Sequence, residues 1–141
     1  WPVTISQIKS PSRTVAAGDS MGTAASVPPS SRLDYLDDSG DYMRYGNEGF
    51  NLDPPRVDPV NGEMANGDSS PKTRTAVDPR HRGRGNVLWL DGAATSEKLE
   101  ALGYRPAPDG SIPFSDADPT ADNTMWSGTG RNDMWKPGYG V

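Results

Sequence analysis

Glycine and proline are the residues that most restrict how this chain can fold. The 141 residues include 16 glycines and 14 prolines, which together interrupt almost every window of the sequence. Because proline breaks a helix interior and glycine weakens it, this pattern excludes a helical bundle or a coiled coil. No apolar run approaches the roughly 20 residues that a membrane-spanning helix needs. We therefore expect a thin core that is wrapped by long loops.

The charge balance and the absence of cysteine exclude further classes of protein. The chain has 14 basic and 19 acidic residues and a net charge of −5, which argues against a general nucleic-acid-binding protein. Without cysteine there is no disulfide, thiolate nucleophile or cysteine-based zinc site. A small, loop-rich chain of this kind must be held by bound ions, by neighbouring subunits or by another part of its own polypeptide.

Two stretches of the sequence predict short β-strands. Residues 14–18 form one strand that ends at a Gly-Asp pair. Residues 86–95 predict a second strand, a tight turn and a short return strand. The turn is predicted at Asp91-Gly92, since this pair is typical of type I′ hairpins, which need positive φ angles.

A short helix is predicted directly after the return strand, over residues 96–102, with Gly103 at its end. Together the elements predict an α+β fold, in which a small antiparallel sheet carries long Gly/Pro-rich loops and one short helix. We expect a single domain over residues 1–141. An extended loop insertion is expected at about 21–77 and a loop-rich aromatic tail at 106–141.

His81 is the only histidine, and nine residues separate it from Asp91-Gly92. From the residues alone, His81 pins the loop before the strand by hydrogen bonds to backbone carbonyls or to a carboxylate. Gly85 and Asn86 allow a kink at the start of the strand. A catalytic role for His81 lacks a nucleophile and a second histidine, and a zinc site lacks ligands.

The motif around His81 resembles a known protein family. It comprises Asp78-Pro79-Arg80-His81, Gly83, Gly85-Asn86-Val87 and Leu90-Asp91-Gly92, and an earlier segment reads ISQIKSPSRTVAAGDS. Residues 3–20 and 78–104 thus resemble bacterial pilin-like proteins that carry a C-terminal signature of histidine, nine residues and Asp-Gly. These proteins are similar to type II secretion pseudopilins and type IV pilins. The middle loop and the last 36 or so residues lie outside the resemblance.

The resemblance implies a pilin-like globular domain and a non-enzymatic structural role in a pilus-like or pseudopilus-like filament. It also implies an extracellular or cell-surface location, which faces the periplasm before assembly. The family's hydrophobic N-terminal helix is not in this sequence, so we expect it to be cleaved or on a separate chain. The expected partners are that helix and further copies of the chain, with no nucleic acid and with membrane contact only through the helix. An apolar face of the sheet should then need cover from elsewhere.

The acidic residues near the C-terminus form a candidate calcium site. Calcium takes six to eight oxygen ligands, and closely spaced carboxylates can supply them. The spacing does not match an EF-hand loop, whereas the resemblance to pseudopilins, which commonly bind calcium in a C-terminal loop, favours calcium. A solvated acidic loop is the alternative. The candidate ligands are Asp116, Asp118, Asp122 and Asn123.

A basic cluster and an aromatic tail are the candidate assembly contacts. Residues 72–84 carry five basic side chains and Asp78, a local charge of +4 against −9 for the remainder. A basic patch on an acidic loop of a neighbouring subunit is one interpretation, and simple solubility is the other. An alternative function is a secreted, calcium-dependent module that binds carbohydrate or a surface through exposed tryptophans. The assembly candidates are Arg80, Arg82, Arg84, Trp126, Trp135 and Tyr139.

Overall fold

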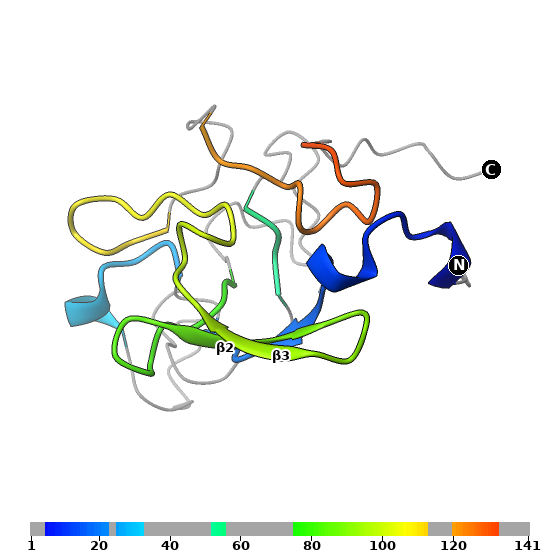
Figure 1. Cartoon of the computed structure of the whole chain (residues 1–141). Coiled ribbons are helices and arrows are strands. Elements are labelled where there is room, and N and C mark those ends of the chain that lie inside the picture. The colour runs from blue at the N-terminus through cyan, green and yellow to red at the C-terminus, as the bar shows by residue number, and fades with distance from the viewer. Residues whose placement is uncertain (1–4, 23–24, 33–51, 56–74, 113–119, 133–141) are drawn as a thin grey trace.

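The computed structural model describes residues 5–22, 25–32, 52–55, 75–112 and 120–132. In these residues the chain forms a three-stranded antiparallel sheet with long connections above it (Figure 1). The strands are β1 (Val15–Gly18), β2 (Gly85–Trp89) and β3 (Ala94–Glu97), in the spatial order β1-β2-β3. The small antiparallel sheet that the sequence predicts is therefore confirmed.

Helical structure in the described residues is limited to three short 3₁₀ segments. They are η1 (Ile5–Gln7), η2 (Pro11–Arg13) and η3 (Pro29–Ser31). Proline begins η2 and η3, as its fixed φ angle favours. Within this part of the chain, no helix has the length and apolar character that crossing a membrane requires.

The predicted helix at 96–102 is wrong. Ser96 and Glu97 belong to β3 and pair with Asn86 and Gly85, so strand pairing outweighs the local helix signal. A single turn follows, and Gly103 ends it at a φ of 94°. The N–H of Tyr104 bonds to the carbonyl of Leu99 at 3.0 Å and that of Gly103 to Glu100 at 3.2 Å, the hydrogen bonds of a Schellman motif.

The hairpin between β2 and β3 also differs from the prediction in its turn type. The N–H of Trp89 bonds to the carbonyl of Ala93 at 2.8 Å, which leaves a three-residue loop. Gly92 has a φ of 88°, whereas Asp91 is not among the residues with positive φ, so the loop is not a type I′ turn. Asp91 Oδ1 instead accepts a bond from the N–H of Ala93 at 3.0 Å.

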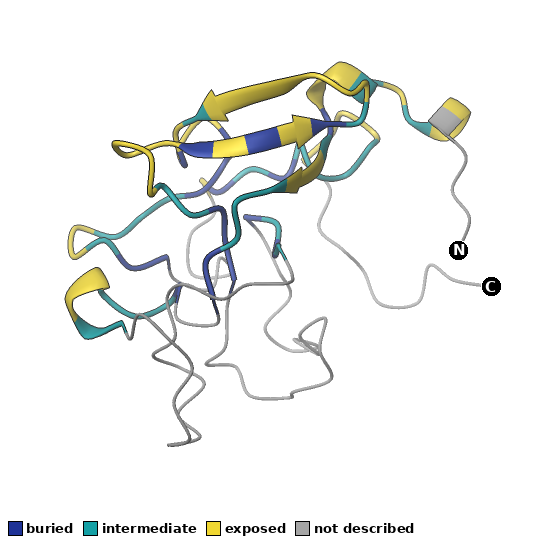
Figure 2. Ribbon diagram, turned by 90° about the horizontal axis from the view of Figure 1, so that it is seen from below, coloured by how far each residue is buried: buried dark blue, intermediate teal, exposed yellow. Residues whose placement is uncertain are grey.

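The two faces of the sheet have different surroundings. Along β2 the residues alternate between buried and exposed, and Figure 2 shows this alternation. Val87 and Trp89 are buried with a core of residues from the loops, namely Met21, Ala25, Ala76, Val77, Leu99, Leu102, Tyr104 and Ile112. The chain therefore covers this apolar face itself, and the expectation that the face needs an external cover is wrong.

The opposite face of the sheet is exposed. Leu88 is paired with Ala17 on β1 and with Ala94 on β3, and directly opposed residues share a face. Both alanines are exposed, and Leu88, at 42%, is the one exposed large hydrophobic residue in the described chain. We call Ala17, Leu88 and Ala94 the outer strip.

Candidate functional site

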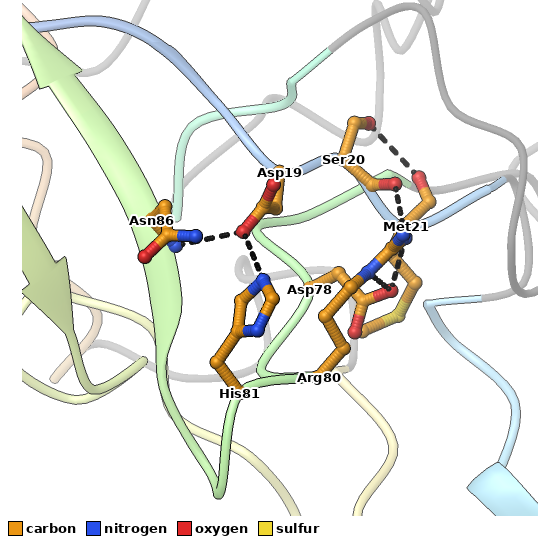
Figure 3. Close-up of polar contacts among 7 residues, drawn as sticks. All are labelled: Asp19, Ser20, Met21, Asp78, Arg80, His81 and Asn86. Carbon is orange, nitrogen blue, oxygen red and sulfur yellow. Dashed lines mark hydrogen bonds and ion pairs between the residues drawn. The ribbon is translucent and has the colours of Figure 1, made fainter.

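The end of β1 and the loop before β2 meet at a carboxylate (Figure 3). Asp19 Oδ2 lies 3.2 Å from Nε2 of His81 and accepts a hydrogen bond from the N–H of Asn86 at 2.9 Å. The side chains of His81 and Asp19 are 50% and 28% exposed, so water reaches both. One carboxylate thus joins two segments that lie 67 residues apart in sequence. We call Asp19, His81 and Asn86 the junction.

Backbone hydrogen bonds extend the contact beyond the junction. The N–H of Asp78 donates to the carbonyl of Asp19 at 2.9 Å, and Met21 donates to Ala76 at 2.8 Å. Arg80 forms an ion pair with Asp78 at 2.6 Å, beside the chain at residues 19–21 (Figure 3). The contact is therefore a continuous seam between residues 19–21, which follow β1, and residues 76–81, rather than an isolated ion pair.

The predicted pinning role of His81 agrees with this geometry, although Asp19 has no assigned role in the sequence analysis. Its signal is present in the sequence, since Asp19 is the last residue but one of the ISQIKSPSRTVAAGDS segment. A carboxylate at a strand end can accept bonds from a neighbouring backbone N–H and an imidazole together. Sequence spacing alone does not reveal that these two segments meet.

A tight turn carries His81 and the basic side chains. The N–H of His81 donates to the carbonyl of Arg84 at 2.9 Å, and the N–H of Arg84 donates to the carbonyl of His81 at 3.2 Å. The two central residues, Arg82 and Gly83, have φ angles of 56° and 81°, as a type I′ turn requires. The type I′ turn therefore lies before β2 rather than after it.

Gly85 stands where a side chain would not fit. A Cβ there would lie 2.3 Å from Cγ1 of Val77 and 2.8 Å from the carbonyl oxygen of Asp78. The seam therefore requires glycine at the start of β2, because the neighbouring backbone passes too close for any other residue. The predicted kink at Gly85 and Asn86 is not present, because both residues belong to β2 and pair in regular register with β3.

The candidate calcium ligands fall partly outside the described residues. Asp116 and Asp118 lie in the part that the structure does not describe. Asp122 Oδ1 accepts bonds from both the N–H and the hydroxyl of Thr124, and the N–H of Asn123 donates to Oδ1 of Asn132 at 2.8 Å. No group of three or more potential metal ligands occurs among the described residues. Calcium binding stays a prediction.

Trp126 is a half-buried residue that contacts the core. Its Nε1 donates to the carbonyl of Leu102 at 2.8 Å, and its ring meets Tyr104 edge to face with centroids 5.6 Å apart. The ring is nevertheless only half-buried, and its roles in assembly and in carbohydrate binding stay predictions. Trp135 and Tyr139 lie outside the described residues.

A small hollow of about 100 Å³ lies between η2 and the turn that Gly103 ends. The side chains around it carry charges of both signs. It is lined by Arg13, Glu100, Ala101, Leu102, Gly103, Arg105, Asp122, Thr124 and Met125. The mixed charge favours no single ligand class, so the junction and the turn beside it remain the candidate functional site.

Comparison with protein-family models, with curated proteins and with solved structures found no match to this chain.

Proposed function

We propose that this chain is a structural subunit of a pilus-like or pseudopilus-like filament with an α+β, pilin-like domain. The junction is the observation that carries the proposal. The two stretches that resemble pilin-like proteins, residues 3–20 and 78–104, contact each other through Asp19 and His81. Motif residues that join two segments of a fold are expected in a structural subunit.

The chemistry of the junction supports a structural role for His81. Nε2 faces a carboxylate that also accepts a backbone N–H, so the imidazole fixes the position of the turn. A histidine that serves as a general base is instead aimed at a nucleophile or a substrate proton. We therefore propose a non-enzymatic protein on the cell surface or outside the cell.

The outer strip supplies a surface for assembly. Apolar residues lie side by side on all three strands of the exposed face, and burying such area between copies drives association. The inner face of the sheet is covered by the chain's own core. A hydrophobic helix that docks on this sheet therefore binds the outer face. Contacts between copies, or with that helix, are then made there.

Self-association of the purified chain tests the proposal. Sedimentation velocity over a hundredfold range of concentration should show growth beyond the monomer, and negative-stain micrographs should show fibres. A single monomeric species throughout, with no fibres, would contradict the proposal. A glycan array with and without calcium examines the alternative, and calcium-dependent glycan binding by a strictly monomeric chain would replace the filament with a binding module.

A further inference from the structure

Arg82 occupies a backbone conformation that long side chains rarely adopt. Its φ of 56° makes it the one non-glycine residue with positive φ in the described chain. Asparagine and glycine are the residues that the first central position of a type I′ turn favours. Arginine there is strained, and strained residues are retained where the side chain has a function.

The three arginines of the basic cluster differ in what they contact. Arg80 is paired with Asp78 at 2.6 Å, and Nη1 of Arg84 donates to the carbonyl of Ser96 at 2.8 Å. Arg82 is exposed at the tip of the turn, and its guanidinium has no hydrogen bond or ion pair with any described residue. Of the three, Arg82 alone presents its full set of donors to a partner.

The charge of the chain indicates which partner fits. In the sequence, residues 72–84 carry a net +4 and the remainder carries −9, so a second copy is rich in carboxylates that can pair with Arg82. A guanidinium binds a carboxylate through two parallel hydrogen bonds, which gives orientation as well as attraction.

We propose that Arg82 is the docking residue through which this chain binds a carboxylate on a second copy of itself. This inference rests on the proposed self-assembly and adds the contact that sets its rate and orientation. The junction anchors one side of the turn through His81 and the start of β2 anchors the other, so the backbone from which Arg82 projects is held in place. The backbone strain at Arg82 is then the cost of presenting a cation at this point.

The substitution Arg82→Asn separates the effect of Arg82 on the stability of the turn from its effect on association. It creates the Asn-Gly pair that type I′ turns favour, so the melting temperature should rise by a few degrees. Association at low ionic strength, measured by sedimentation velocity, should fall about tenfold, and this difference should shrink at roughly 0.5 M salt. Arg82→Lys keeps the charge without the planar fork and should restore only part of the association.

Arg131→Asn is the matched control, because it makes the same charge change at another exposed arginine. It should leave association within about twofold of the unaltered chain. If both variants reduce association equally, net charge explains the effect and the inference fails. It also fails if Arg82→Asn associates normally or gains no stability. If the unaltered chain does not self-associate at all, the filament proposal itself is overturned. If the unaltered chain binds anionic vesicles or nucleic acid instead of a second copy of itself, the choice of partner is wrong.

Discussion

Two glycines with nearly equal φ angles have very different surroundings. Gly103 and Gly92 have φ values of 94° and 88°. A Cβ on Gly103 would lie 1.9 Å from the carbonyl oxygen of Asp122, whereas a Cβ on Gly92 would meet nothing within 4 Å. Position 103 therefore combines a backbone requirement with a steric one, and position 92 has the backbone requirement alone.

Alanine at each position should separate the two requirements. Gly92→Ala should lower the free energy of unfolding by about 1 kcal/mol, because only the left-handed backbone conformation opposes it. Gly103→Ala should lower it by about 3 kcal/mol or more, since the segment at Asp122 must also move. Urea denaturation followed by fluorescence measures both. Equal losses would show that Asp122 does not pack against this turn.

The stability of the fold should depend on pH through Asp109, because its carboxylate accepts hydrogen bonds. The hydroxyl and the N–H of Ser111 donate to Asp109 Oδ1 at 2.6 and 2.9 Å, and the hydroxyl contributes most to holding the pKa of that carboxyl below its ordinary value. A lowered pKa in the folded state stabilises the fold above the unfolded-state pKa. This contribution is lost as the pH falls through the folded-state pKa.

Ser111→Ala should raise the pKa of Asp109 toward its ordinary value, because the stronger of the two donors is removed while the N–H remains. Carboxyl chemical shifts in an NMR pH titration measure the change. Ser12→Ala, at an exposed serine of η2, should leave the pKa of Asp109 unaltered. An unaltered pKa in Ser111→Ala would show that the hydroxyl does not bond to this carboxylate in solution.

At the scale of elements, the junction holds the end of β1 against the turn before β2. Asp19→Ala removes the acceptor of a backbone N–H as well as the partner of His81, so it should lower the free energy of unfolding by about 1–2 kcal/mol. His81→Ala breaks only a half-exposed pair and should lower it by less than about 1 kcal/mol. Asp19→Asn, which can still accept from Asn86, should fall between them.

A double-mutant cycle in urea isolates the contact between the two side chains. The coupling free energy between Asp19→Ala and His81→Ala should be favourable and below about 1 kcal/mol. The control pair is His81→Ala with Ser12→Ala, which should show no coupling. A coupling of zero for Asp19 and His81 would mean that the imidazole does not hold this seam.

The strands could be predicted from the sequence because apolar runs and turn residues are local signals. The run from Val87 to Trp89 and the glycine at 92 place β2 and the hairpin to within a residue or so. The prediction of a helix over residues 96–102 was wrong because a serine that can cap a helix fits equally well in a short return strand. Only pairing with β2 decides between them, and pairing is a tertiary interaction.

The candidate site was less predictable than the strands for the same reason. His81 could be singled out since it is the only histidine, but its partner depends on which distant segment folds beside it. Trp126 is a similar case. The sequence singles it out as a large ring in the aromatic tail, but it does not show that the Nε1 of this ring bonds to a carbonyl 24 residues away. Contacts between residues so far apart in the sequence produce no periodic pattern from which they could be predicted.

At the scale of the whole molecule, one tyrosine connects the loops to the core. The hydroxyl of Tyr104 donates to the carbonyl of Asp53. The N–H of Asp53 donates to the hydroxyl of Thr75 at 3.0 Å, and the carboxylate of Asp53 accepts from the N–H of Thr75 at 2.8 Å. The ring also contacts Trp126. With so thin a core, a single buried side chain links segments that the sheet does not reach.

Tyr104→Phe should therefore destabilise the whole described fold rather than one loop. The ring is kept, but the carbonyl of Asp53 loses its donor, which should lower the free energy of unfolding by about 1–3 kcal/mol. Near-ultraviolet circular dichroism and backbone amide exchange would follow the effect in distant segments. A change confined to residues near Asp53 would show that the loops are independent of the core.

The two faces of the sheet give the sharpest prediction for the assembled molecule, because adjacent residues of β2 point to opposite sides. Val87 is 1% exposed and Leu88 is 42% exposed. Val87→Asp buries an unpaired charge and should unfold the chain, whereas Leu88→Asp should lower the free energy of unfolding by about 1 kcal/mol or less. If the outer strip is an assembly surface, Leu88→Asp should keep a cooperative melting transition yet remove fibres from micrographs. Ser96 pairs with Asn86 and is exposed on the same face outside the strip, so Ser96→Asp adds the same charge there and should leave fibres in place. Fibres that persist in Leu88→Asp would place assembly on another surface.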